Sequence, residues 1–442
     1  MSKRLLVVVV ILCAGLNLLS CGGNPSSSNR SGLPHRVLAS QGVTSLSVFV
    51  GLVIVNGDND TLPRVSPLAN GAAAGLTVVS PTRNIAATFD SSSNSVVAAD
   101  TANESTIGAV RLPGPTSSIV IPTATATGFA AVPTATVGGF GFQGAVEALN
   151  FSTNSFATIA VSNAQTVVSN SQGTQLLVFS SDSDNMTVLF PGAALPPVDT
   201  SCFDNPPNPA VCVQVQDSRL SRPVNAIING TTAYILNCGF ECGGTLPNGD
   251  PALASVAVFD LGSLTVTQTV TVDAATMALL SGSTLYVAGT PANFPCPAAQ
   301  NTGAATCGTL DVVDLNSMQV TTRTAITDGY HQRMDLTTNG QLFVGSRNCT
   351  NIGNINNPGP GEIRGCLSIY RIADGSVVIP QDNGDVTGLQ GFTTRNIEYV
   401  AEGGQLRVYD TTKDILLIND FVPQGTIDVV GYVSDVKAID FF

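Results

Sequence analysis

The ten cysteines are the residues of this sequence with the clearest chemical roles. Cys13 and Cys21 lie near the N-terminus, and the other eight occur as four pairs of sequence neighbours. An even number of cysteines in an exported chain predicts disulfide bonds. A metal site at Cys238 and Cys242 is the alternative, but the sequence has only two histidines that could complete one. The neighbouring pairs are Cys202 with Cys212, Cys238 with Cys242, Cys296 with Cys307, and Cys349 with Cys366.

A second group of chemically active side chains is formed by Asp328, Tyr330, His331 and Arg333, the densest ionisable cluster in the sequence. Such a cluster could bind a ligand, and the competing interpretation is a loop with ordinary hydrogen bonds. No nucleophile elbow, phosphate-binding loop, dinucleotide fingerprint or His-Glu-x-x-His motif occurs. The sequence therefore indicates no catalytic residue, no metal site and no cofactor.

Three acidic segments raise the question of calcium, because carboxylates at alternate positions can share a hard cation. They lie at 58–60, 182–185 and 382–385. None completes the twelve-residue loop that makes the EF-hand pattern specific. Asp, Asn and Gly are also the residues that hairpin turns require, so turns are the favoured interpretation.

Composition indicates the kind of fold that carries these residues. Apolar residues make up 43% of the chain, charged residues only 11%, and tryptophan is absent. Abundant Val, Ile and Thr together with Gly, Ser and Asn predict an all-β domain with many turns. The net charge of −13 would repel phosphate backbones, so nucleic-acid binding is disfavoured.

An internal repeat organises the chain. The hairpin at 399–411, YVAEGGQLRVYDT, recurs along the sequence in self-similar units of four strands. Units of about 40 to 55 residues are the signature of β-propeller blades. The copies begin near residues 36, 85, 118, 165, 224, 276, 334 and 386, with 190–223 as a Pro-rich insertion between blades.

The two ends of the repeat region are complementary. The first copy lacks its first strand, and 427–442 ends in an alternating strand that could supply it. We therefore expect a single propeller over 36–442, with eight blades and a ring closed by pairing the N- and C-terminal strands in one composite blade. Seven blades is the alternative, if 118–150 is an irregular extension.

The best copies resemble the YVTN family of β-propeller repeats, which occurs in bacterial envelope and surface proteins. They are 399–411, LYVAG at 285–289 with LDVVDL at 310–315, and SVVAADT at 95–101. The resemblance places Asp100, Asp260, Asp314 and Asp410 at the aspartate that ends a strand. We expect each to accept hydrogen bonds from turn amides and to hold the next hairpin.

The repeat also narrows the cysteine pairing. Cys296 with Cys307, and Cys349 with Cys366, flank insertions between the second and third strands of a blade. Adjacent strands bring such positions within the reach of a disulfide. Loops of this kind emerge on one face of a propeller, so the cysteine-tied loops should cluster there. The segment 328–333 precedes an inner strand, where side chains can reach the central channel.

The N-terminus carries an export signal. Residues 1–20 have a charged start and an apolar core, and Leu18-Leu19-Ser20-Cys21 resembles the lipobox of bacterial lipoproteins. The resemblance implies lipidation of Cys21, a flexible tether over 21–35, and anchoring in the cell envelope, with the outer membrane favoured. An ordinary secretory signal or a short membrane anchor is the alternative.

Two functions are consistent with these features. The first is a lipid-anchored, non-enzymatic scaffold that binds an envelope protein or a glycan. The second is a propeller enzyme, of the lactone hydrolase or oxidoreductase type, with a site at the central channel. Fold analogy alone does not license the chemistry of propeller enzymes.

Overall fold

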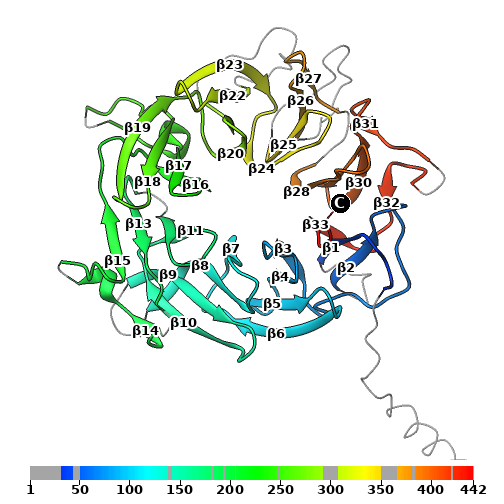
Figure 1. The fold of residues 1–442 in the computed structure, drawn as a ribbon, viewed down its shortest axis with the longest axis horizontal. Helices are drawn as coiled ribbons and strands as arrows, with labels where there is room; N and C mark the ends of the chain where they lie inside the picture. The colour runs from blue at the N-terminus through cyan, green and yellow to red at the C-terminus, as the bar shows by residue number, and fades with distance from the viewer. Residues whose placement is uncertain are drawn as a thin grey trace, which may run out of the picture.

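The chain forms a ring of eight β-sheets, each of them one propeller blade (Figure 1). The computed structural model describes residues 31–42, 50–137, 142–180, 183–192, 195–204, 206–246, 248–291, 307–349, 366–380, 384–419 and 422–441. The eight-bladed, all-β architecture expected from the repeat is confirmed. The segment 118–150 forms the strands of a blade, so the seven-bladed alternative is wrong.

The blades are numbered in chain order, and their strands are given from the centre of the ring outward. Blades 1 to 4 contain β33 (Tyr432–Ala438), β1 (Arg36–Gly42) and β2 (Gly51–Asn56); β3 (Ala74–Val79), β4 (Ile85–Asp90), β5 (Ser95–Asp100) and β6 (Ser105–Arg111); β7 (Ser118–Val120), β8 (Thr127–Val137), β9 (Phe142–Asn150), β10 (Ser155–Ala160) and β14 (Val198–Asp199); and β11 (Ala164–Ser169), β12 (Leu176–Ser180), β13 (Met186–Leu189) and β15 (Cys212–Val215).

Blades 5 to 8 contain β16 (Pro223–Asn229), β17 (Thr232–Asn237), β18 (Ser255–Asp260) and β19 (Thr265–Thr271); β20 (Met277–Ser281), β21 (Thr284–Gly289), β22 (Gly308–Asp314) and β23 (Gln319–Ile326); β24 (Tyr330–Leu336), β25 (Gln341–Arg347), β26 (Leu367–Arg371) and β27 (Val377–Val378); and β28 (Val386–Gly391), β29 (Ile397–Glu402), β30 (Gln405–Asp410), β31 (Ile415–Leu416) and β32 (Thr426–Ile427). Two short 3-10 helices, η1 (Ser201–Phe203) and η2 (Gly239–Cys242), lie in loops. In the part of the chain described above, no helix has the length and apolar character needed to cross a bilayer.

The ring closes as the complementary ends predict. Strand β33 is the innermost strand of blade 1 and pairs antiparallel with β1, so that Val37 lies opposite Ala438. Beside this pair, the guanidinium of Arg36 donates to both carboxylate oxygens of Asp440, at 2.9 and 2.8 Å. It also donates to Glu104 of blade 2 at 2.9 Å. One arginine therefore joins the first strand, the C-terminal segment and the next blade.

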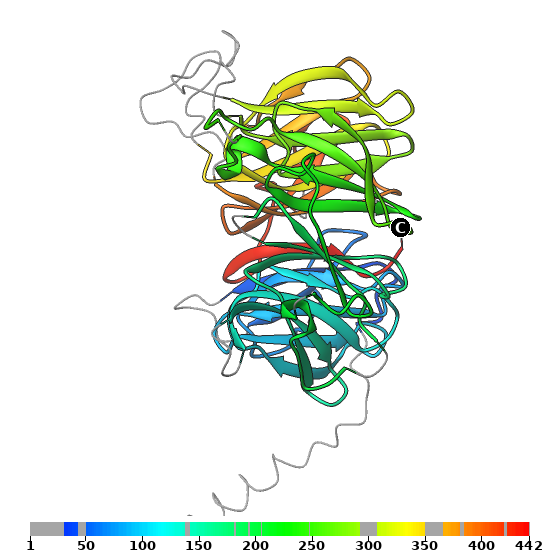
Figure 2. The same ribbon diagram turned by 90° about the vertical axis from the view of Figure 1, so that its left-hand side faces the viewer.

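The two faces of the ring differ, and the course of β33 tells them apart. The start of β33 lies beside the β29–β30 turn, because the Val433 N–H donates to the carbonyl of Gly404 at 2.8 Å. We call this side the disulfide face, since it carries every loop between a second and a third strand. Strand β33 ends on the opposite side, where β1 begins and Arg36 binds Asp440. We call that side the closure face. Figure 2 shows the ring edge-on.

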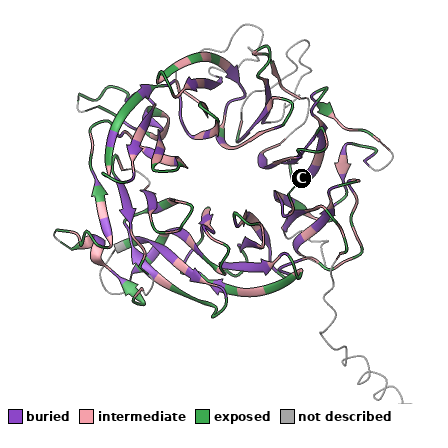
Figure 3. Ribbon diagram, in the orientation of Figure 1, coloured by how far each residue is buried: buried purple, intermediate pink, exposed green. Residues whose placement is uncertain are grey.

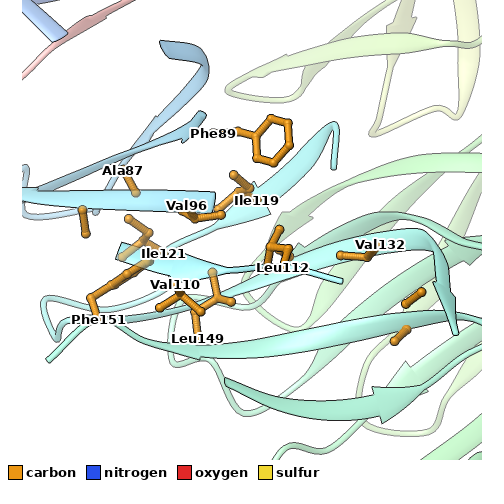
Figure 4. Packing of buried hydrophobic residues seen from close by; sticks show 14 of the residues in the cluster. Ala87, Phe89, Val96, Val110, Leu112, Ile119, Ile121, Val132, Leu149 and Phe151 are labelled. Carbon is orange, nitrogen blue, oxygen red and sulfur yellow. The ribbon is translucent and has the colours of Figure 1, made fainter. Parts of the chain in front are cut away.

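Neighbouring blades pack face to face through alternating side chains. In β5, Val96 and Ala98 belong to the core shared with blade 3, whereas Val97 and Ala99 face blade 1. This is the two-residue periodicity of a strand buried on both sides. Figure 4 shows the first of these cores, where Phe89 and Val96 meet Ile119 of β7. The outer strands, by contrast, alternate buried with exposed residues along the rim (Figure 3).

The Pro-rich segment 190–223 contributes strands that the sequence did not reveal. Strand β14 pairs in parallel with β10 of blade 3, and β15 is the outer strand of blade 4. The Cys202–Cys212 disulfide joins η1 to β15 and so fixes the segment to the rim. The segment thus links two blades and completes one of them.

The aspartates at the ends of third strands hold the turns that follow, as expected from the repeat. Asp100 accepts the N–H groups of residues 102 and 103, at 2.8 and 3.0 Å. Asp260 and Asp314 accept turn N–H groups in the same way, and Asp410 accepts the N–H of Thr412. Asn150, at the same position of blade 3, accepts the N–H groups of residues 152 and 153. An amide therefore replaces the carboxylate there without loss of the turn.

Candidate functional site

The disulfide face carries the predicted disulfides of three consecutive blades. The loop after β17 contains Cys238–Cys242, and the loop after β25 contains Cys349–Cys366. Cys307, before β22, is also disulfide-bonded, while its expected partner Cys296 lies outside the described residues. All these loops follow the second strand of a blade, so they emerge on one face, as the strand order predicts.

A central cavity of about 550 Å³ opens within the ring, among the inner strands of blades 2 to 7. Its wall is mostly uncharged and polar, and it includes Ser118, Gln165, Thr166, Asn225, Gln332 and Asn348. Tyr330, Arg333 and Arg347 lie among them. The side chain of Arg347 is 48% exposed and lies 3.6 Å from the carboxylate of Asp385. The cavity therefore offers hydrogen-bonding groups and an aromatic ring with little net charge.

The four residues predicted from the sequence separate into two pairs in the structure. Tyr330 is 48% exposed and lines both the central cavity and a smaller one, of about 170 Å³, that also contacts Cys242 of blade 5. Arg333 faces the inner strands of two further blades. Its Nε–H donates to the carbonyl of Thr387 at 2.7 Å, and Nη2 lies 3.6 Å from Asp435 of β33.

The other two predicted residues are buried. His331 has no exposed surface, and its Nε2–H donates to the carbonyl of Thr327 at 2.9 Å. Burial lowers the pKa of His331 to about 4, so the ring is neutral at pH 7. Asp328 is 4% exposed, and its main-chain carbonyl accepts from the Ser346 hydroxyl at 2.7 Å. The structure thus brings Tyr330 and Arg333 to the cavity and places Asp328 in the packed interior. His331 borders the cavity but has no exposed surface.

Sequence reasoning missed Glu241, which stands between the two cysteines of Cys-Gly-Phe-Glu-Cys. Its Oε2 is buried and has no hydrogen-bond partner among the described residues. Burial raises the pKa of Glu241 to about 8, although a backbone N–H of Thr290 opposes the shift. The sequence feature that could have pointed to Glu241 is its position between two closely spaced cysteines.

A buried pair of carboxyl groups lies between blades 7 and 8. Glu398 is fully buried, and burial followed by the adjacent Asp335 carboxylate raises its pKa well above the ordinary value. Asp335 accepts the N–H of Gly391 at 2.5 Å. Two such neighbouring carboxyl groups cannot both ionise at low cost, which is why the pKa of Glu398 is raised.

The acidic segments are engaged within the protein. Asp60 forms a two-pronged ion pair with Arg395, at 2.8 and 2.7 Å, and accepts from the hydroxyl of Tyr399. Asp385 accepts the N–H of Asn348 at 2.7 Å. Over the described ranges, no group of three or more His, Cys, Asp or Glu residues is placed to hold a metal. At 58–60 the N–H groups of Asp58 and Asp60 donate to Asn56, as in the expected turn. Asp182, Asp382 and Asn383 of the other two segments lie outside the described residues.

Comparison with known proteins supports the fold. No protein-family model matches the sequence, and no curated protein matches it either. The solved structure of the dihydro-heme d1 dehydrogenase NirN in complex with DHE is similar, with a TM-score of 0.58 and 12% identity over 96% of this chain and 78% of that chain. Hydrazine synthase of Kuenenia stuttgartiensis gives a TM-score of 0.46 and 15% identity over 68% of this chain and 78% of that one. At these identities the likeness concerns the propeller fold alone.

Proposed function

We propose that this chain is a lipid-anchored protein of the bacterial cell envelope, and that its propeller is a non-enzymatic scaffold for binding a protein or glycan partner. In this proposal Cys21 carries the lipid, the repeats are of the YVTN type, and the partner binds on the disulfide face. The lipobox and the segment 1–20 lie outside the described residues, so the anchor rests on the sequence.

One observation carries the proposal. The disulfide-tied loops of blades 5 to 7 and the mouth of the central cavity share one face, while β1 begins on the opposite face. A tether that leaves from Arg36 therefore attaches to the closure face. The disulfide face then points away from the membrane, where an envelope partner can reach it.

The wall of the central cavity suits a polar partner. Hydroxyl and amide groups at Thr166, Asn225 and Asn348 can both donate and accept hydrogen bonds. The exposed ring of Tyr330 adds an apolar surface of the kind that stacks on a sugar or packs against a side chain.

A central-channel enzyme is the second candidate, and a single observation favours it. Tyr330 and Arg333 both line the cavity where propeller enzymes bind substrates. Against it, the histidine of the same segment is buried, neutral and bonded to a main-chain carbonyl. It is therefore not placed to exchange protons with a ligand in the cavity.

The binding test compares the two faces in the full-length lipoprotein. Co-purification from detergent-solubilised envelopes should recover a defined partner with the native chain. We expect Arg347→Glu and Tyr330→Ser, both on the disulfide face, to lose that partner. Lys413→Glu is the matched control, since Lys413 is 67% exposed in a turn of the closure face. Retention of the partner by both disulfide-face variants would place the binding surface elsewhere.

The anchor has its own test. Radiolabelled palmitate should be incorporated into the native chain and not into Cys21→Ala, which should leave the membrane fraction. Equal labelling of the two forms would show that Cys21 is not the lipidated residue. This result is separate from the binding result, because the soluble Cys21→Ala form keeps the disulfide face intact.

A further inference from the structure

A second cavity lies on the disulfide face between blades 5 and 6. Its volume is about 360 Å³, close to the lower end of the range for small-ligand pockets. Phe240, Pro251 and Leu253 from the β17–β18 loop form an apolar side, and the two larger side chains are 41% and 71% exposed. Glu241, Asp273 and Arg323 form the polar side.

Glu241 is fixed in this wall by the fold. It belongs to η2, whose turn is closed by the Cys238–Cys242 disulfide. Its Oε2 lies against Gly289, where an added Cβ would come within 2.7 Å of that oxygen. Only a glycine at 289 leaves the carboxyl group this position. The oxygen is buried without a hydrogen-bond partner in the part of the chain that is described.

The charges around the pocket leave an excess of carboxylate. The guanidinium of Arg323 lies 3.4 Å from Asp273 and 3.4 Å from Asp311. One cation thus faces two acids, and Asp311 also accepts the N–H of Asp273 at 2.6 Å. Arg222 lines the neighbouring cavity and lies 3.8 Å from Asp184. The pocket therefore favours a cation over an anion.

The remaining neighbour of Glu241 is neutral. Tyr330 lines a cavity together with Cys242, the residue after Glu241, and burial followed by the charge of Glu241 raises the pKa of Tyr330 above its usual value. The phenol keeps its proton at neutral pH and cannot neutralise a second charge. Among the described residues, the side chain of Glu241 thus has the backbone N–H of Thr290 as a partner but no cation.

We propose that this pocket binds an alkylammonium group, with Glu241 and Asp273 as its charge partners and with Phe240, Pro251 and Leu253 around its methylene chain. A primary amine has three N–H donors, which match the carboxyl groups of Glu241 and Asp273 in the lining. An aliphatic stem fits the apolar side, as lysine stems cover apolar surfaces in proteins. The site is independent of the partner proposed for the central cavity.

Binding should depend on pH in one direction. The pKa of Glu241 is about 8 in the empty pocket, so the carboxyl is mostly protonated at pH 7. An ammonium group favours the carboxylate, and binding therefore releases a proton. Affinity should rise by about tenfold per pH unit up to the pKa of Glu241, and then level until the amine loses its own proton. A carboxylate ligand would show the opposite trend.

The experiment titrates the full-length protein with n-butylamine, n-butyrate and an acetylated, amidated Ala-Lys-Ala peptide at several pH values between about 6 and 8.5. Calorimetry should show about one proton released per amine bound near pH 7, and butyrate should not bind. Tighter binding of the peptide than of butylamine would identify a lysine of a partner protein as the source, and the reverse order a free amine.

Variants complete the test. Glu241→Gln should weaken amine binding about tenfold or more at pH 8 and abolish its pH dependence, while Asp273→Asn should weaken it without removing that dependence. Asp428→Asn, an exposed carboxylate before β33, is the control for net charge and should bind as the native protein does. Circular dichroism checks that each variant is folded. Unchanged amine affinity in Glu241→Gln, or butyrate binding that strengthens as pH falls, would overturn the proposal.

Discussion

The two faces of this propeller are formed by opposite ends of the same strands, but their turns differ in regularity. On the closure face, the turns between the third and the fourth strand of blades 2, 3, 5, 6 and 8 repeat one geometry, whereas blade 4 has the segment 190–211 at this place. An Asp or Asn accepts the turn amides, and the residue four positions later is left-handed, with φ of 50°, 53°, 56°, 51° and 57° at Glu104, Asn154, Leu264, Met318 and Asp414. In blade 7, Arg371 stands in place of the aspartate. The residue four positions later, Gly375, still has a positive φ.

On the disulfide face, the corresponding turns differ from blade to blade. Blade 8 has a two-residue turn, in which Gly403 and Gly404 have φ of 58° and 82° as a type I′ hairpin requires. Blades 5 to 7 carry long loops tied by cysteines. The unpaired oxygen of Glu241 lies on this side. The comparison teaches that the closure face carries the regular turns that define the ring. The loops of the disulfide face can differ between blades without altering the ring.

The largest effect should come from breaking the closure face. Arg36→Ala removes the bonds to Asp440, Glu104 and the carbonyl of Thr101, and leaves Glu104, whose side chain is 2% exposed, without its cation. We expect the free energy of unfolding to fall by roughly 3 kcal/mol, as for other broken buried ion pairs. Urea unfolding followed by circular dichroism measures the loss.

Arg219→Ala is the control for this substitution. The guanidinium of Arg219 pairs with Asp217, two residues away, and the Arg219 side chain is 41% exposed. We expect no measurable change in its unfolding curve. A loss in Arg36→Ala no larger than in the control would show that the ring does not depend on this ion-pair network.

Opening the disulfide face should have an effect of the same size or smaller, depending on which link is removed. The double variant Cys349→Ser, Cys366→Ser opens a link with a sequence separation of 17, which should cost about 3 kcal/mol in the chain-entropy account. The Cys238–Cys242 link, with a separation of 4, should cost about 2 kcal/mol. Denaturant unfolding of both double variants tests this order. The reverse order would mean that the shorter link supports more than its own turn.

The smallest effect should follow from a single turn of the closure face. Asp410→Ala loses the bonds to the N–H and hydroxyl of Thr412, at 2.9 and 2.6 Å, and should cost about 1 kcal/mol. Asp410→Asn keeps an acceptor, as Asn150 does in blade 3, and should retain most of the stability. Thermal unfolding of the pair compares them. Equal losses would show that the charge, and not the acceptor, holds the turn.

The sequence predicted the repeated part of the molecule well. Periodic strands gave eight blades, and the missing first strand near Arg36 gave the composite blade with β33. Local pairing also predicted Cys349–Cys366, because both residues flank one hairpin. Such features depend on neighbours in the sequence or on a pattern that recurs.

The sequence did not predict what depends on contacts between blades. Tyr330 reaches the cavity beside Cys242, two blades away, while His331, the next residue, turns into the interior between blades 6 and 7. Successive side chains along a strand point to opposite faces of the sheet. This rule does not say which of two neighbours lines the central cavity. The buried carboxyl of Glu241 likewise arises from packing against Gly289, which is far away in the sequence.

The position of β33 has a consequence for how the protein is made. Among the described strands it comes last in the sequence, yet it is the innermost strand of the first blade. During synthesis or export every other blade can assemble first, but the ring stays open until residues 432–438 have emerged. A chain cut short before them exposes the pairing edge of β1 and the apolar face of blade 8. Closure of the ring therefore depends on residues 432–438.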